Sequence, residues 1–74
     1  MQYEIDSSNN QFLIVDVGWP PDANLRLTYI TNEHSIRINK FDSHIFPGPE
    51  IEIKYIPALI EQLEMMYNDK KGET

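Results

Sequence analysis

One segment near the C-terminus, residues 48–67 (GPEIEIKYIPALIEQLEMMY), constrains the fold of this chain more than any other feature. At about 100° per residue, its apolar side chains gather within an arc of roughly 120°, the stripe width of a helix that packs on a core. Pro57 suits the first helical position, because its missing N–H would have had no partner there. The pattern predicts a helix over residues 57–67, preceded by a strand over residues 51–55. The apolar stripe comprises Ile56, Leu59, Ile60, Leu63, Met66 and Tyr67.

The chain before this segment predicts β-strands. Residues 2–6 and 11–17 are typical of a hairpin around the polar turn at residues 7–10. Residues 12–15 are all apolar, which predicts that the second strand is central and covered on both faces.

A second hairpin is predicted over residues 25–31 and 35–41, and its register follows from side-chain alternation. Opposed residues on two strands share a face of the sheet. A loop with an even number of residues places Leu27 and Tyr29 beside Ile36 and Ile38, whereas an odd loop mixes apolar with polar side chains. The even loop is therefore predicted, and it gathers four polar residues on the other face: Arg26, Thr28, Arg37 and Asn39.

These elements predict an α+β fold, an antiparallel sheet of four to five strands packed by one C-terminal helix. We expect a single domain over residues 1–69 and a polar tail over residues 70–74. A domain this small buries only about 60% of its unfolded surface, and the chain has no cysteine for a disulfide, so oligomerisation is the expected aid to stability. Trp19 follows Gly18 in a proline-containing loop, where it either covers one end of the core or forms an exposed anchor for a partner.

No motif for catalysis or for cofactor binding is present, so we expect a protein that is not an enzyme and holds no cofactor. His34, Asp42 and His44 lack the spacing and the fourth ligand of a metal site, and no metal is expected. No apolar run is long enough to span a membrane and the N-terminus does not resemble a signal peptide, so we expect a cytoplasmic protein without membrane contact.

The charge of the chain is informative about partners. The 12 acidic residues outnumber the 6 basic ones, for a net charge of −6, which disfavours binding to double-stranded DNA and favours basic partners. The acidity could equally serve solubility alone. Arg26 and Arg37 form either a modest basic platform or an ordinary solvated face whose cations pair with Asp or Glu across the strands.

Residues 25–67 resemble the transcriptional coactivator family that binds single-stranded DNA, most closely at GPEIEIKYIPALIEQLEMM, where a short strand leads into the helix. The resemblance implies a curved antiparallel sheet, a dimer formed through the helix and nucleic-acid binding by basic and aromatic residues. The matching basic positions are Arg26, Arg37, Lys40 and Lys54, with Trp19 as an aromatic candidate. The acidic balance departs from that family's pattern, because counterion release requires a dense cationic surface.

The small size, the acidity and the absence of cysteine and motifs also resemble phage early proteins that take over host machinery. Several of these mimic DNA, which implies a basic DNA-binding partner such as a histone-like nucleoid protein, and action in the bacterial cytoplasm. Glu61 and Glu64 are neighbours at i, i+3 on the helix, about 5–6 Å apart between Cβ atoms, near a phosphate-like spacing. The carboxylates expected to bind the partner are Glu33, Asp42, Glu50, Glu52, Glu61, Glu64 and Asp69.

The helix carries a second, smaller feature on the face opposite its stripe. Ala58 and Met65 lie at i, i+7 with Gln62 between them. This ridge is compatible with helix-to-helix packing across a two-fold axis in a homodimer, or with ordinary surface residues.

Overall fold

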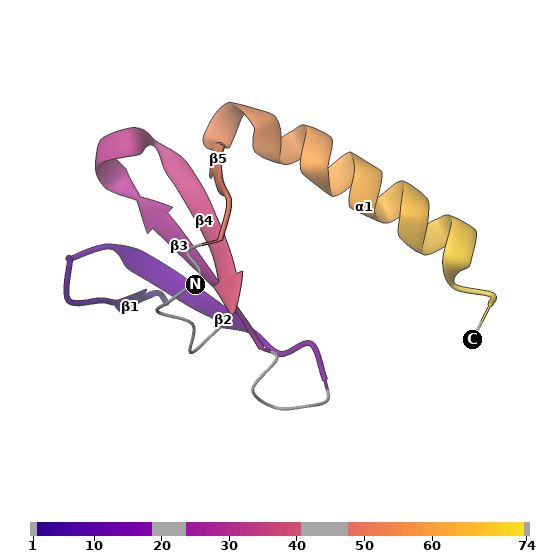
Figure 1. The fold of residues 1–74 in the computed structure, drawn as a ribbon, viewed down its shortest axis with the longest axis horizontal. Coiled ribbons are helices and arrows are strands. Elements are labelled where there is room, and N and C mark those ends of the chain that lie inside the picture. The colour runs from indigo at the N-terminus through magenta and orange to yellow at the C-terminus, as the bar shows by residue number, and fades with distance from the viewer. Residues whose placement is uncertain (1, 19–23, 41–47, 74) are drawn as a thin grey trace.

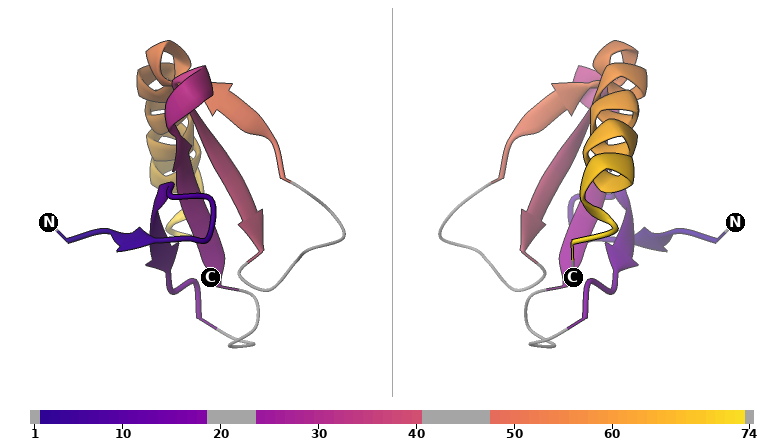
Figure 2. Two further views of the ribbon diagram at one scale, coloured as in Figure 1. Left: turned by 90° about the vertical axis from the view of Figure 1, so that its left-hand side faces the viewer. Right: turned by 90° about the vertical axis from the view of Figure 1, so that its right-hand side faces the viewer.

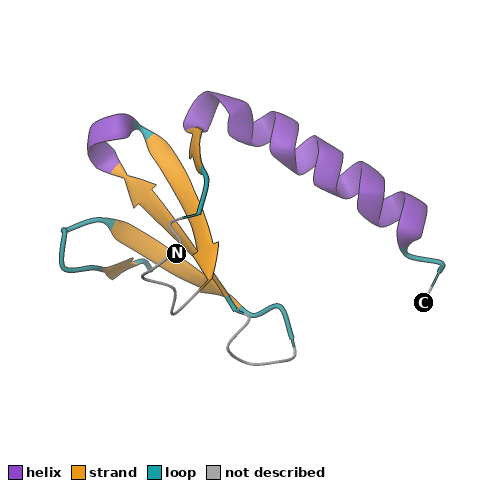
Figure 3. Cartoon of the chain, viewed as in Figure 1, coloured by secondary structure: helices purple, strands orange, loops and turns teal. Residues whose placement is uncertain are grey.

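The computed structural model describes residues 2–18, 24–40 and 48–73. The described residues contain a five-stranded antiparallel sheet in which each strand pairs with the next strand along the chain (Figures 1 and 3). The α+β fold class is therefore confirmed. The elements are β1 (Glu4–Ile5), β2 (Gln11–Val15), β3 (Leu25–Ile30), the 3₁₀ turn η2 (Thr31–Glu33), β4 (Ser35–Lys40), β5 (Glu50–Glu52), the 3₁₀ turn η3 (Ile53–Tyr55) and the helix α1 (Ile56–Lys70).

Asp6 organises the turn between β1 and β2. Its Oδ1 accepts hydrogen bonds from the backbone N–H groups of Ser8 and Asn10, both at 2.9 Å. Asn9 adopts a positive φ of 65°, a conformation that asparagine tolerates better than most residues. The polar turn predicted at residues 7–10 is confirmed, with strands shorter than expected on both sides.

The β3–β4 hairpin has the predicted register. Leu27 lies opposite Ile38 and Tyr29 opposite Ile36, while Arg26 and Thr28 lie opposite Asn39 and Arg37 on the other face. The connection is the even, four-residue loop Thr31 to His34, whose last residue has a φ of 51°. Side-chain alternation thus identified both the register and the two faces of this hairpin correctly.

The strand predicted over residues 51–55 is wrong in its second half. β5 covers Glu50–Glu52 only, and Ile53–Tyr55 form η3. The reason lies in the neighbouring strand, because β4 begins at Ser35, which pairs with Glu52, so residues beyond Glu52 have no strand to pair with. Ile53 instead donates its backbone N–H to the carbonyl of His34 at 3.1 Å, which ties η3 to the tip of the β3–β4 hairpin.

Gly48 lets the chain approach β4 closely just before β5. A Cβ at this position would overlap the backbone carbonyl of Ile38, and the N–H of Ile38 donates to the carbonyl of Pro49 at 3.1 Å. Only glycine fits this approach.

Helix α1 contains the residues of the predicted apolar stripe, but it does not lie on the sheet of its own chain. It runs from Ile56 to Lys70, one residue into the segment predicted as a tail, and diverges from the sheet as it leaves η3 (Figure 1). Figure 2 shows the helix on one side of the sheet, beyond it in one view and in front of it in the other. The apolar stripe, expected to pack on the core, is exposed in its second half, with exposed fractions of 50% for Ile60, 59% for Leu63 and 67% for Tyr67.

The buried residues of the described ranges all lie on one face of the sheet. Thr28, Ser35 and Ile30 are exposed by less than a tenth, and their alternation places them on the face of Arg26 and Arg37. Among the described residues, Ile30 is the only apolar one that is buried. The prediction that β2 is covered on both faces is wrong, because its residues are half-buried or exposed.

Candidate interaction surfaces

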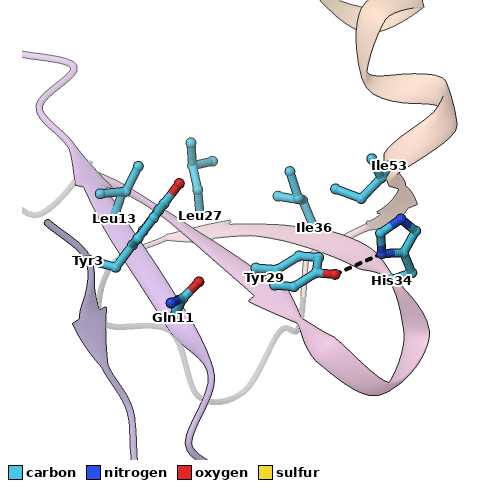
Figure 4. A pocket seen from close by; sticks show the side chains of 8 residues that line it. All are labelled: Tyr3, Gln11, Leu13, Leu27, Tyr29, His34, Ile36 and Ile53. Carbon is cyan, nitrogen blue, oxygen red and sulfur yellow. Dashed lines mark hydrogen bonds between the residues drawn. The ribbon is translucent and has the colours of Figure 1, made fainter. Parts of the chain in front are cut away.

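The face of the sheet that carries Leu27 and Ile36 forms an open apolar groove of about 400 Å³. Figure 4 shows the aliphatic side chains of the groove standing up from adjacent strands, with Ile53 of η3 at one end. The sequence pattern predicts that Leu27, Tyr29 and Ile36 face a core beneath the helix, whereas in the structure this face is open. The groove is lined by Tyr3, Gln11, Leu13, Leu27, Tyr29, His34, Ile36 and Ile53.

A polar pair closes one end of this groove. The hydroxyl of Tyr29 and Nδ1 of His34 are 2.7 Å apart, and the two rings meet edge to face with centroids 5.9 Å apart (Figure 4). The left-handed backbone of His34 turns its ring back toward β3. The rest of the lining is mostly apolar, so the groove offers burial of apolar surface rather than a cluster of charges.

Arg26 is already engaged on the opposite face of the sheet. Its guanidinium lies 3.9 Å from the centre of the Phe12 ring, and its Nη2 is 3.2 Å from Oδ2 of Asp6. Its Nε also donates to the hydroxyl of Thr28 at 3.3 Å. A base could stack on this face of the Phe12 ring only by displacing Arg26.

The other basic residues matched to the coactivator family are also largely paired. Arg37 meets Glu50 at 3.1 Å across β4 and β5, and Lys54 meets Glu52 at 3.3 Å. The expectation of cross-strand pairing on this face is confirmed by Arg37 and Glu50. Lys40, at the end of β4, is exposed. Glu50 and Glu52, which were predicted to bind a partner, thus form ion pairs with cations of the same chain.

The carboxylates of the helix are arranged differently. Glu61 and Glu64 are exposed and make no ion pair with any residue of the described ranges. Near the end of the helix, Lys70 lies 3.4 Å from Asp69 and 3.3 Å from Glu73. Glu33 is exposed in η2, whereas Asp42 and also Trp19 fall outside the described residues. The predicted acidic surface is therefore concentrated on α1 and does not extend evenly over β5.

The predicted dimer ridge lies on the exposed side of α1. Ala58, Gln62 and Met65 are all exposed, and Nε2 of Gln62 is 3.8 Å from Sδ of Met65. Met65 is 58% exposed, nearly the same as Leu63 of the apolar stripe. The helix thus presents two exposed faces of different character, and the stripe is the more apolar of the two.

No group of three or more His, Cys, Asp or Glu side chains in the described ranges could hold a metal ion. Within the same ranges, no helix has the length and apolar character needed to cross a membrane. A scan of protein-family models and searches of the curated proteins and of the solved structures found no match to this chain.

Proposed function

We propose that this chain is a non-enzymatic interaction protein that occupies the basic DNA-binding surface of a nucleoid-type, histone-like protein or of a transcription protein. Its net charge of −6 favours a basic partner. The carboxylates of α1 take the place of backbone phosphates, and the partner contributes the lysines and arginines that would otherwise bind DNA.

The observation that supports this proposal best is the distribution of ion pairs. Arg26, Arg37 and Lys54 each lie within 3.3 Å of a carboxylate of the same chain. A nucleic acid would have to displace these carboxylates, and the partly buried pair of Arg26 with Asp6 opposes this more than the exposed pairs, which contribute only about 0–1 kcal/mol. Glu61 and Glu64, in contrast, are exposed and form no salt bridge within the described ranges, so they can accept charge-assisted hydrogen bonds from a partner.

The spacing of the helical carboxylates suits this role. Side chains at i and i+3 share one face of a helix, with Cβ atoms about 5–6 Å apart. While α1 is folded, its backbone holds these charges at fixed separation, which lowers the entropy lost on binding. Exposed charges attract a basic partner over roughly a Debye length, about 10 Å at 0.1 M salt, so the association should be fast and sensitive to salt.

Competition for DNA tests the proposal. A histone-like nucleoid protein is bound to a fluorescent DNA duplex, and the chain is added at about 0.05 M and about 0.3 M salt, which span a clear change in screening. We expect the chain to release the duplex at low salt and to lose most of that capacity at high salt. No release at low salt would contradict the proposal for this class of partner.

Two double variants with equal charge change locate the binding surface. Glu61→Gln with Glu64→Gln removes the carboxylates that have no described cation, whereas Glu50→Gln with Glu52→Gln removes those paired with Arg37 and Lys54. We expect the helix variant to compete at least about tenfold less well and the β5 variant to change little, since each charge-assisted hydrogen bond to an ionised group contributes about 1.5–3 kcal/mol. Equal weakening would show that net charge alone matters.

Direct titration of a labelled single-stranded oligonucleotide separates this function from the coactivator-type alternative. Binding that is lost on Arg26→Ala or Arg37→Ala would support direct nucleic-acid binding in its place. The existing pairs of these two arginines with Asp6 and Glu50 weigh against it.

A further inference from the structure

The chain exposes more surface than a compact protein of its size. It has an accessible surface of 6253 Å², whereas the scaling for folded monomers gives about 4,700 Å² for 8.7 kDa. Its radius of gyration is 13.8 Å, against about 11.3 Å for a compact domain of this length. The single chain therefore exposes an excess of surface that a second copy could cover.

Two apolar surfaces contribute to this excess. One is the stripe of α1, where Ile60, Leu63, Met66 and Tyr67 are exposed by half or more. The other is the groove on the open sheet face, formed around Leu13, Leu27 and Ile36 (Figure 4). In a core built from helices and a sheet, the apolar stripe of a helix is buried against an apolar face of the sheet, and both surfaces are removed from water.

The helix of the same chain is held away from its own groove. Tyr55 and Ile56, which join η3 to α1, both have right-handed helical dihedral angles, so the 3₁₀ turn continues into the helix without a hinge. The hydrogen bond from Ile53 to His34 attaches this turn to the hairpin tip. To lay its stripe on its own sheet, α1 would have to break η3 or that bond.

The lengths of the two surfaces agree. A helix of 15 residues extends about 22 Å, and a six-residue strand such as β3 or β4 extends about 20 Å. One helix can therefore cover the central hairpin from end to end. In a two-fold arrangement each chain gives a helix and receives one, which satisfies both surfaces at once and leaves no open end.

We propose that α1 of one copy of this chain packs its Leu63 stripe into the Leu13–Leu27–Ile36 groove of a second copy, and the reverse, in a two-fold dimer. The exchange supplies the core that the single chain lacks, since Ile30 is its only buried apolar residue in the described ranges. Glu61 and Glu64 lie outside the stripe and remain exposed, so the dimer does not depend on the proposed function. The interface differs from the Ala58–Met65 ridge predicted from the sequence.

Sedimentation equilibrium with two matched variants tests the dimer. Leu63→Glu and Met65→Glu change residues of almost equal exposure on opposite sides of the helix. We expect the unmodified chain and Met65→Glu to sediment at twice the mass of 8.7 kDa, and Leu63→Glu to dissociate at least 100-fold more readily. A monomeric unmodified chain overturns the proposal, as does Met65→Glu if it weakens the dimer as much as Leu63→Glu.

Cysteine cross-linking tests the partner of the stripe, because the chain has no native cysteine. The double variant Leu27→Cys and Leu63→Cys is oxidised and run on a non-reducing gel, with each single variant as a control. We expect a covalent dimer from the double variant alone. An internal bridge, seen as an oxidised monomer, would show that α1 closes on its own sheet, and a covalent dimer of Leu63→Cys alone would show helix-to-helix packing. Either outcome overturns the proposal.

Discussion

The β3–β4 hairpin and helix α1 both carry amphipathic patterns, yet among the described residues only the hairpin finds its partners. Every residue of β3 faces a residue of β4, and the tip of the hairpin also anchors η3. Most of α1 is exposed, and only Ile56 and Leu59 are partly covered. A short turn is enough to bring two strands together, whereas a helix needs a surface that its own connection must let it reach.

The comparison indicates that the free energy of unfolding of the single chain resides in the sheet and its junctions. Substitutions there should unfold the chain, and substitutions on the outer side of α1 should act locally.

Gly48→Ala should have the largest effect. The added Cβ overlaps the carbonyl of Ile38, so the chain must lift from β4 and give up the hydrogen bond from Ile38 to Pro49. We expect a loss of about 3 kcal/mol or more in the free energy of unfolding, at the upper end of overpacking penalties. Urea denaturation followed by circular dichroism measures this loss. Gly72→Ala is the matched control, since nothing lies within 4 Å of its Cβ position, and an equal loss there would refute the explanation.

Asp6→Asn should have an intermediate effect. The carboxylate of Asp6 pairs with Arg26 at exposed fractions of 18% and 24%, and it also accepts two backbone hydrogen bonds. Asparagine can keep those two bonds, but its amide then faces the guanidinium, so we expect a cost of about 1–2 kcal/mol from the lost charge-assisted bond. The measurement is again urea denaturation.

Glu52→Gln is the control for that change. Its pair with Lys54 has exposed fractions of 58% and 68%, and exposed ion pairs contribute about 0–1 kcal/mol. If Glu52→Gln lowered stability as much as Asp6→Asn, partial burial of the Asp6–Arg26 pair would not be the cause.

Sequence reasoning succeeded where the information is local. The register of β3 and β4 follows from the alternation of Leu27, Tyr29, Ile36 and Ile38 and from the parity of one short loop. The stripe of α1 follows from helical spacing in the same way. Neither conclusion required knowledge of a distant part of the chain.

The failures involve non-local geometry. β5 ends at Glu52 because Glu52 pairs with Ser35, the first residue of β4. The 3₁₀ turn at residues 53–55 could therefore not be predicted from the alternation of these residues alone. Whether α1 covers the sheet depends on the direction that η3 imposes on it. For the candidate site, the acidic character was predicted, but which carboxylates are paired with cations depends on strand register and on the conformation of each side chain.

A glycine in the middle of α1 should have the smallest and most local effect. Gln62→Gly and Gln62→Ala differ by about 1 kcal/mol in helix propensity, and Gln62 is exposed and is not part of the apolar stripe. An isolated helix of 15 residues is marginal in water, so in dilute protein the glycine should speed amide hydrogen exchange about fivefold within α1. The amides of β3 and β4 should then be unaffected.

In concentrated protein the proposed dimer makes α1 part of a core, and the same glycine should also reduce the protection of β3 and β4 against amide hydrogen exchange. Equal effects on helix and sheet in dilute protein would show that α1 is coupled to its own sheet, and the contrast between the two regions would fail.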